Sequence, residues 1–309
     1  MAISDRTEEL HSSLSQILTT KQGKVAITAG PATVWILLLL LAPMIFMVIV
    51  SFLEVSRETY DIIFEPTLKN YQALFDSSLG FWESPFVKAL LLSYGIAIIS
   101  TILCLTLAFP LAYLLAKRGG QTFKVVIFLV LLPFFTMYLV RAYSWVLMFG
   151  QGGVLNSTLL SIGLISEPIE LLNYGVFAII VGLTHAYFPY MLLTLYASLD
   201  GIDFSLVDAA RDLGASRVAV MKDHILPLTA PGIVGGSLFV FVPSVGAFIT
   251  PRFLGQGKVQ MIGILIEGRV NGGYAIGYAS AASMFVLISI VAAMVLTFRY
   301  VSIEELGGG

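Results

Sequence analysis

The chain has 309 residues, of which 58% are hydrophobic and only 12% are charged, and its formal net charge is -2. A water-soluble domain usually carries about 25% charged residues, so this chain has too few charges to cover a surface that faces water. The composition therefore predicts an integral membrane protein and excludes the strongly basic surface that is typical of nucleic-acid binding.

Six apolar stretches, at residues 31–53, 86–116, 125–148, 174–199, 232–254 and 276–300, are candidates for membrane spans. A helix needs about 20 residues to cross the hydrocarbon core, and each stretch is long enough. Barrel strands alternate in polarity, whereas these stretches are apolar throughout. Lipid also offers the backbone no hydrogen-bond partners, so the stretches must be helical. We therefore predict an all-α integral membrane domain over residues 31–300, with tails at 1–30 and 301–309.

Basic residues beside the spans predict the orientation, because cytoplasmic loops carry an excess of lysine and arginine. The loop between the second and third stretches holds Lys117, Arg118 and Lys124, whereas the loop over residues 149–173 holds none. This contrast places the former loop inside and the latter outside. With six spans, both termini are then expected in the cytoplasm.

The third stretch contains Arg141, the one permanent charge deep within a predicted span. Placing arginine at the bilayer centre costs roughly 2.5–3.5 kcal/mol. Its side chain therefore either reaches the headgroups or faces a transport pathway or a neighbouring subunit. Tyr138, Tyr143 and Trp145 surround it in sequence. Such aromatic residues either form the belt at the membrane surface or line a pathway and stack on a cationic or aliphatic solute.

The fourth stretch contains His185, which is either a hydrogen-bonded packing residue or a functional one. No Asp or Glu lies in any of the six stretches. Intramembrane proteases need paired aspartates or clustered metal ligands, and proton-coupled carriers usually contain intramembrane acids. We therefore predict neither an enzyme nor a metal site, and a secondary carrier or channel is the alternative from another class. In the last outer loop, Glu267 is either a solvated surface residue or a contact for the solute or a binding protein.

The loop over residues 200–231 has a pattern that predicts two short helices joined by a glycine corner. Ser205 can cap the first helix, and Asp208 three residues later completes a capping box. Gly214 then ends this helix at a position that favours a left-handed residue. One face of the helix carries Leu206, Ala209, Ala210 and Leu213.

The second short helix of this loop is expected to begin at Ser216 as its cap and to stop at Pro227. The two helices either lie on the membrane surface or dock on another protein. Small alanines on the exposed face favour docking, because they let a partner approach closely.

The fifth stretch begins with Gly232 and Gly236, a G-x-x-x-G pattern that permits close helix packing. Pro243 is expected to break the helix near the middle of the membrane, as in helices that border a substrate passage. Ser244 and Phe248 would then face that passage, unless the break is a kink without function.

The cytoplasmic loop also resembles the coupling motif of ABC importer permeases. That family writes the motif as EAA, three residues, G, nine residues, I, one residue and LP. The residues that match it in spacing are Asp208, Ala209, Ala210, Gly214, Leu226 and Pro227. Asp208 replaces the usual glutamate, and His224 stands at the isoleucine position with Ile225 one residue later. Four segments, at residues 68–75, 138–145, 207–216 and 225–237, further resemble the spermidine/putrescine permease subfamily.

This resemblance implies the six-helix fold of a type I ABC importer permease in a bacterial inner membrane, with a coupling helix that docks on an ATP-hydrolysing subunit. The expected coupling residues are Asp208, Ala209, Ala210, Leu213, Gly214, Ile225, Leu226 and Pro227. The candidate pathway residues are Tyr138, Arg141, Tyr143, Trp145, Pro243, Ser244 and Phe248.

The resemblance also implies partners. These are a second homologous permease, two ATPase subunits that bind ATP and Mg, a periplasmic solute-binding protein and membrane lipid, with no nucleic acid. The chain has no G-x-x-x-x-G-K-[ST] motif, so we expect it to bind no nucleotide or other cofactor itself. The implied solute is a polyamine, with an opine, a phosphonate, thiamine or ferric ion as alternatives in the same importer class.

Overall fold

The computed structural model of the protein describes residues 21–55, 62–76, 80–272 and 275–300. The predicted C-terminal tail, residues 301–309, lies outside these residues. Of the predicted N-terminal tail, residues 21–30 already belong to helix α2 (Lys21–Ser51). The limits that we set for the membrane domain, at residues 31 and 300, stay a prediction.

Long apolar helices confirm the predicted fold class. Within the described residues, five helices are long and apolar enough to cross a membrane, and a bent pair of helices is a sixth candidate. The five are α2, α4 (Pro85–Arg118), α8 (Val176–Asp200), the continuous run Arg217–Val245 and α14 (Ile276–Tyr300). The limits of α8 and α14 lie within two residues of those predicted for the fourth and sixth stretches.

The third predicted span is not one straight helix. It consists of α5 (Gly120–Leu131), the 3-10 turn η2 (Leu132–Phe135) and α6 (Tyr138–Met148), and its two halves meet at 93°. Pro133 lies in the turn and has no backbone N–H to donate to the preceding helical turn. The α-helix therefore ends there, and the chain restarts as a separate half-helix.

Two prolines of the fifth span act differently from our predictions. Pro227 does not stop the second loop helix, because α10 (Arg217–Val220) continues through the π-turn η4 (Met221–Ile225) into α11 (Leu226–Val245). In the π-turn the Leu226 N–H donates to the carbonyl of Met221, five residues back, which shifts the hydrogen-bond ladder beside the proline. Pro243 does not break α11 either. The helix ends two residues later, and α12 (Ile249–Gly255) follows.

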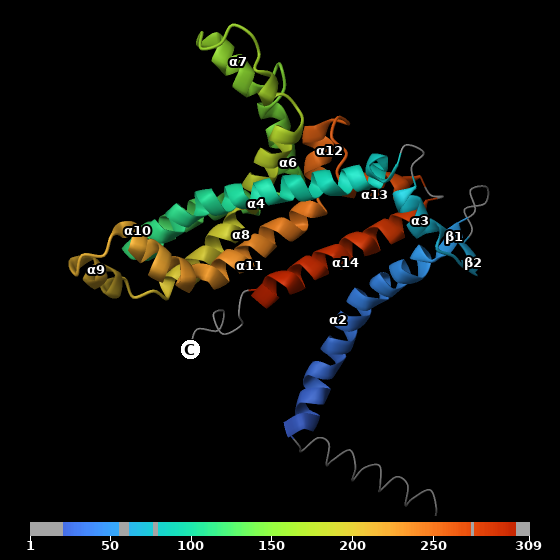
Figure 1. Ribbon diagram of the computed structural model, residues 1–309, viewed down its shortest axis with the longest axis horizontal. Coiled ribbons are helices and arrows are strands. Elements are labelled where there is room, and N and C mark those ends of the chain that lie inside the picture. The colour runs from blue at the N-terminus through green and yellow to red at the C-terminus, as the bar shows by residue number, and fades with distance from the viewer. Residues whose placement is uncertain (1–20, 56–61, 77–79, 273–274, 301–309) are drawn as a thin grey trace, which may run out of the picture.

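Helices α4, α8 and α11 run side by side at the centre of the molecule (Figure 1). Gly232 and Gly236 of α11 face α8, which confirms that the G-x-x-x-G pattern permits close packing. A Cβ atom on Gly232 would lie 2.5 Å from Ser198 Oγ and 2.7 Å from the Thr194 carbonyl oxygen. Helix α14 packs on α2, whose apolar side chains are exposed along most of its length, as lipid contact requires.

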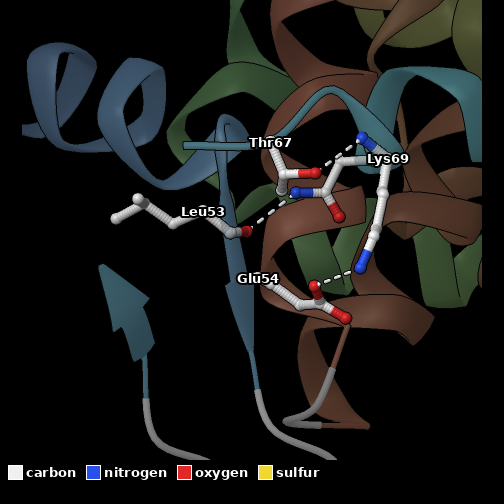
Figure 2. Close-up of polar contacts among 5 residues, drawn as sticks. Leu53, Glu54, Thr67 and Lys69 are labelled. Atoms are coloured by element: carbon white, nitrogen blue, oxygen red, sulfur yellow. Dashed lines mark hydrogen bonds and ion pairs between the residues drawn. The ribbon is translucent and has the colours of Figure 1, made fainter. Parts of the chain in front are cut away.

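Several connections between the long helices hold short elements that the hydrophobic pattern did not predict. Strands β1 (Leu53–Val55) and β2 (Ile62–Pro66) form an antiparallel hairpin, followed by α3 (Lys69–Phe75) and the turn η1 (Phe81–Glu83). Figure 2 shows Lys69 donating to Glu54 and to the Thr67 hydroxyl, which ties α3 to the hairpin. The remaining short elements are α7 (Val154–Ser161), η3 (Glu170–Leu172) and α13 (Ile262–Asn271). Helix α7 projects away from the helical body (Figure 1).

Candidate coupling loop and transport pathway

The first loop helix, α9 (Phe204–Asp212), is capped two residues earlier than predicted. Asp203, not Ser205, is the capping residue, and its carboxylate accepts a hydrogen bond of 2.9 Å from the Ser205 N–H. Hydrogen bonds from the Ser205 side chain and backbone hold the pKa of Asp203 below its usual value. Asp208 is therefore not needed for capping.

The corner after α9 depends on a glycine, as predicted. Gly214 has a φ of +95°, a conformation that other residues rarely adopt. The Ala215 N–H reaches back to the Ala210 carbonyl at 3.1 Å and closes the turn. Ser216 then caps α10, because its hydroxyl accepts from the Ala219 N–H at 3.1 Å, which confirms the second predicted cap.

The loop has an outward apolar face and an inward one. Leu206 and Leu213 are 70% and 91% exposed, and Ala209 is also exposed. In contrast, Val207 is buried in the core cluster of α4 and α8, with Ala210 packed against it. The outward side chains are therefore available to a partner without unpacking the membrane domain.

The structure divides the other predicted coupling residues in the same way. Leu226 and Pro227 are exposed, whereas Ile225 is 2% exposed and belongs to the core cluster. Ile225 is thus a packing residue in this structure. Asp208 carries a contact that the sequence did not reveal, because its carboxylate pairs with Lys117 Nζ of α4 at 3.1 Å.

A cavity of about 550 Å³ lies between α8, α11 and α14. It is lined by Tyr187, Tyr190, Gly235, Leu238, Phe239, Val242, Pro243 and Met294. A smaller cavity of about 270 Å³ shares Tyr187 and Pro243 with it and adds Tyr138 and Phe248 to the lining. Aromatic rings form much of the wall of both cavities beside α11.

Three of the predicted pathway residues, Tyr138, Pro243 and Phe248, meet at these cavities. The Tyr138 hydroxyl also hydrogen-bonds with Thr250 Oγ1 of α12 at 2.6 Å. The structure does not place Ser244 there, since it is fully buried and donates to the Val240 carbonyl of its own helix. Of the predicted pathway residues, Ser244 is thus absent from the cavity walls, whereas Tyr138 of α6 and Phe248, which follows α11, are part of them.

The other two aromatic candidates on α6 lie elsewhere. Tyr143 is 53% exposed and meets Phe253 edge to face. Trp145 donates from Nε1 to His185 Nδ1 at 3.2 Å, so His185 has the hydrogen bond expected of a packing residue. Sequence reasoning missed Tyr187, Tyr190 and Phe239 as lining residues. The only available signal was that two tyrosines follow His185 on one helix.

Arg141 lies over aromatic rings rather than beside an acid. Its guanidinium carbon is 4.3 Å from the centroid of the Phe134 ring and 5.7 Å from that of Tyr138. Among the described residues, no acceptor reaches its buried Nε and Nη1 atoms. Within the described residues, the Arg141 guanidinium is therefore stabilised by cation–π contacts with these ring faces.

Glu267 of α13 is a wall residue of a third cavity, of about 390 Å³, which also contains Phe248. Its carboxylate accepts from Arg252 Nη1 at 2.5 Å and from Asn271 Nδ2 at 2.7 Å. The side chain is 26% exposed, so it is neither freely solvated nor unpaired. In the part of the chain that the structure describes, no group of His, Cys, Asp and Glu residues could hold a metal ion.

Comparison with known proteins assigns the chain to a family. The family model described as "Binding-protein-dependent transport system inner membrane component" matches residues 96–301, which is more than half of the chain. The chain belongs to this permease family. The matched region includes the coupling loop and every cavity-lining residue named above.

Curated relatives of this permease cover most of its length. It is 33% identical to the spermidine/putrescine transport system permease protein PotB of Haemophilus influenzae over 259 residues, 83% of this chain and 87% of the relative. It is 35% identical to PotB of Escherichia coli over 234 residues, 75% of this chain and 82% of the relative.

A solved structure supports the fold of this permease. A chain from the crystal structure of a bacterial ABC transporter involved in the import of the acidic polysaccharide alginate superposes with a TM-score of 0.64. The two chains are 19% identical, and the match covers 88% of this chain and 92% of the other. At that identity the likeness concerns the fold, and it agrees with the predicted type I permease architecture.

Proposed function

We propose that this permease is one of two transmembrane subunits of an ATP-driven importer of a polyamine such as spermidine or putrescine. The observation that carries the proposal is the coupling loop, a capped helix and a glycine corner with an exposed apolar face on the side predicted to be cytoplasmic. The likeness to two PotB permeases over most of the chain supports the solute class.

The energy for import would come from two partner ATPases that bind ATP and Mg, because this chain has no phosphate-binding loop. Leu206 and Leu213 would insert into a cleft of the ATPase, as an amphipathic helix does in a groove. Fully burying one leucine side chain contributes about 1.5–3 kcal/mol, so these two side chains would be main contributors to docking. ATP-driven closure of the two ATPases would then move the membrane helices, so that the transport pathway opens alternately to the two sides of the membrane.

Other partners follow from the same proposal. A periplasmic binding protein would deliver the solute to the outer connections, and a second permease would complete the pathway. Both termini would then lie in the cytoplasm and the coupling loop beside them, in the bacterial inner membrane.

The aromatic cavity suits a polyamine in two ways. Ring faces attract ammonium groups, and the same rings pack against the methylene segments between those groups. The volume of about 550 Å³ falls in the range of small-molecule sites. An oxyanion such as a phosphonate would gain little from this lining, because its exposed surface is made of rings and aliphatic side chains. An opine, thiamine and ferric ion remain the alternatives within the importer class.

Transport by the complete assembly tests the proposal. The permease would be reconstituted into proteoliposomes with its second permease, ATPase and binding protein, and uptake of labelled spermidine and putrescine would be measured. We expect uptake that requires ATP and that excess unlabelled polyamine abolishes. Competition by thiamine, an opine, a phosphonate or ferric ion would instead identify another solute. Uptake by this chain alone, without nucleotide, would show a secondary carrier or channel.

A further inference from the structure

The cytoplasmic end of α4 touches the coupling helix α9 at two points. Tyr113 and Phe204 meet edge to face, with ring centroids 5.6 Å apart and an interplanar angle of 75°. Lys117 Nζ lies 3.1 Å from Asp208 Oδ1. The two α4 residues are four positions apart, and so are the two α9 residues, so each pair occupies one face of its helix.

We propose that these four residues, which we call the α4 clamp, set the orientation of the coupling helix and transmit its displacement to span α4. The clamp residues are Tyr113, Lys117, Phe204 and Asp208. Lys117 is then a positioning residue, because it acts on the partner ATPase only through Asp208. This inference rests on the proposed function, since a coupling helix matters only if an ATPase docks on it.

The clamp is needed because α9 has few other attachments. The helix has nine residues and is followed by the Gly214 corner, so the chain beyond it does not fix its rotation. Val207 is its one fully buried side chain, and it shares a helix face with Phe204, three positions earlier, whereas Asp208 lies on the adjoining side of the helix. The Tyr113–Phe204 contact and the partly exposed Lys117–Asp208 pair hold α9 at two points besides Val207, and this favours one rotation of the helix about its axis.

Helix α4 is suited to carry a displacement across the membrane. It has 34 residues, which corresponds to a length of about 50 Å. Near the clamp, Ala108, Ala112 and Leu115 pack in the core cluster that also contains Val207. At the other end, Phe86 and Val87 are buried against α14 and the outer connections. A tilt imposed at the clamp would therefore reach the outer end of the permease through one continuous helix.

The clamp also separates two roles of neighbouring basic residues. Lys117 and Arg118 both add positive charge to the cytoplasmic side and so favour the same orientation. Arg118 is exposed and, among the described residues, makes no ion pair. A charge reversal at Arg118 therefore matches the topological effect of one at Lys117 without touching α9.

The test uses the reconstituted importer and measures ATP hydrolysed per polyamine imported, together with ATPase retained on co-purification. We expect Lys117→Glu to lower uptake at least fivefold while ATP hydrolysis falls less, so that the ratio rises. Lys117→Arg should keep the wild-type ratio, and Arg118→Glu should leave it unchanged. The double variant Lys117→Glu with Asp208→Lys should couple better than either single variant.

Two outcomes would overturn the clamp. One is a wild-type ratio of ATP to polyamine in Lys117→Glu. The other is a double variant that couples no better than its parents although it retains the ATPase. Failure of the wild-type assembly to link ATP hydrolysis to uptake would instead count against the proposed function. The outer pair Lys69→Glu with Glu54→Lys provides a matched charge exchange far from α9, and we expect no change in its ratio.

Discussion

The contact between α8 and α11 permits a quantitative prediction from two glycines on one helix. In Gly232→Ala, the new methyl group would lie 2.5 Å from Ser198 Oγ and 2.7 Å from the Thr194 carbonyl oxygen. The serine side chain can rotate away, but the carbonyl belongs to the backbone of α8, so the helices must move apart. In Gly235→Ala, the methyl group would meet nothing within 4 Å.

The two variants share the same gain in helix propensity, about 1 kcal/mol for alanine over glycine. Overpacking costs about 1–3 kcal/mol, and only Gly232→Ala incurs it. We therefore expect Gly232→Ala to be about 1–3 kcal/mol less stable than Gly235→Ala. Thermal unfolding of the purified permease in detergent measures this difference, at about 2–4 °C per kcal/mol for a domain of 150–250 residues. Equal unfolding temperatures would refute the close packing of α8 on α11.

Three further predictions concern the loop and the cavity. Gly214→Ala forces a left-handed backbone that costs roughly 1–2 kcal/mol, so uptake should fall while membrane insertion is retained; normal uptake would contradict the corner. The lowered pKa of Asp203 means that its cap is fully formed at neutral pH and is lost as pH falls through that pKa. Hydrogen exchange at the Ser205 amide should therefore gain protection that disappears in acid, and Asp203→Asn should remove this pH dependence. Tyr190→Leu keeps an apolar side chain in the cavity wall but removes a ring face, and we expect a higher polyamine concentration for half-maximal uptake; an unchanged concentration would show that the solute does not contact this cavity.

The sequence predicted the parts of the fold that a long apolar run specifies. The fourth and sixth spans were placed within two residues because each is one uninterrupted helix, as its continuous apolar run predicts. Pro189 is buried inside α8, and the helix continues past it to Asp200. The third span was predicted as one helix, since each half of the bent pair is apolar and composition does not report direction. Pro133 was the available signal for the bend.

The coupling loop was predicted well where the signals are local. Gly214 and Ser216 act within four residues of their own positions, so turn and capping rules identified both. The cap at Asp203 was missed because Ser205 is an equally good capping residue by type. The Lys117–Asp208 pair joins residues 91 positions apart, and no single-sequence rule connects them. The residues that line the cavity could not be predicted from the sequence either. Aromatic residues that line a pathway and those that form the belt at the membrane surface recur along a helix with the same spacing.

The closely fitted seam between α8 and α11 has a consequence for how this permease can move. Because the glycines of α11 contact backbone atoms of α8 directly, the two helices cannot easily slide past each other. They should therefore move as one rigid body. Met294 of α14 faces these two helices across the cavity of about 550 Å³, where ring and thioether surfaces can separate without breaking hydrogen bonds. Opening and closing of the transport pathway would thus occur mainly at this apolar interface between α14 and the α8–α11 pair. Mutations that make the interface more rigid should slow the transport cycle without destabilising the fold.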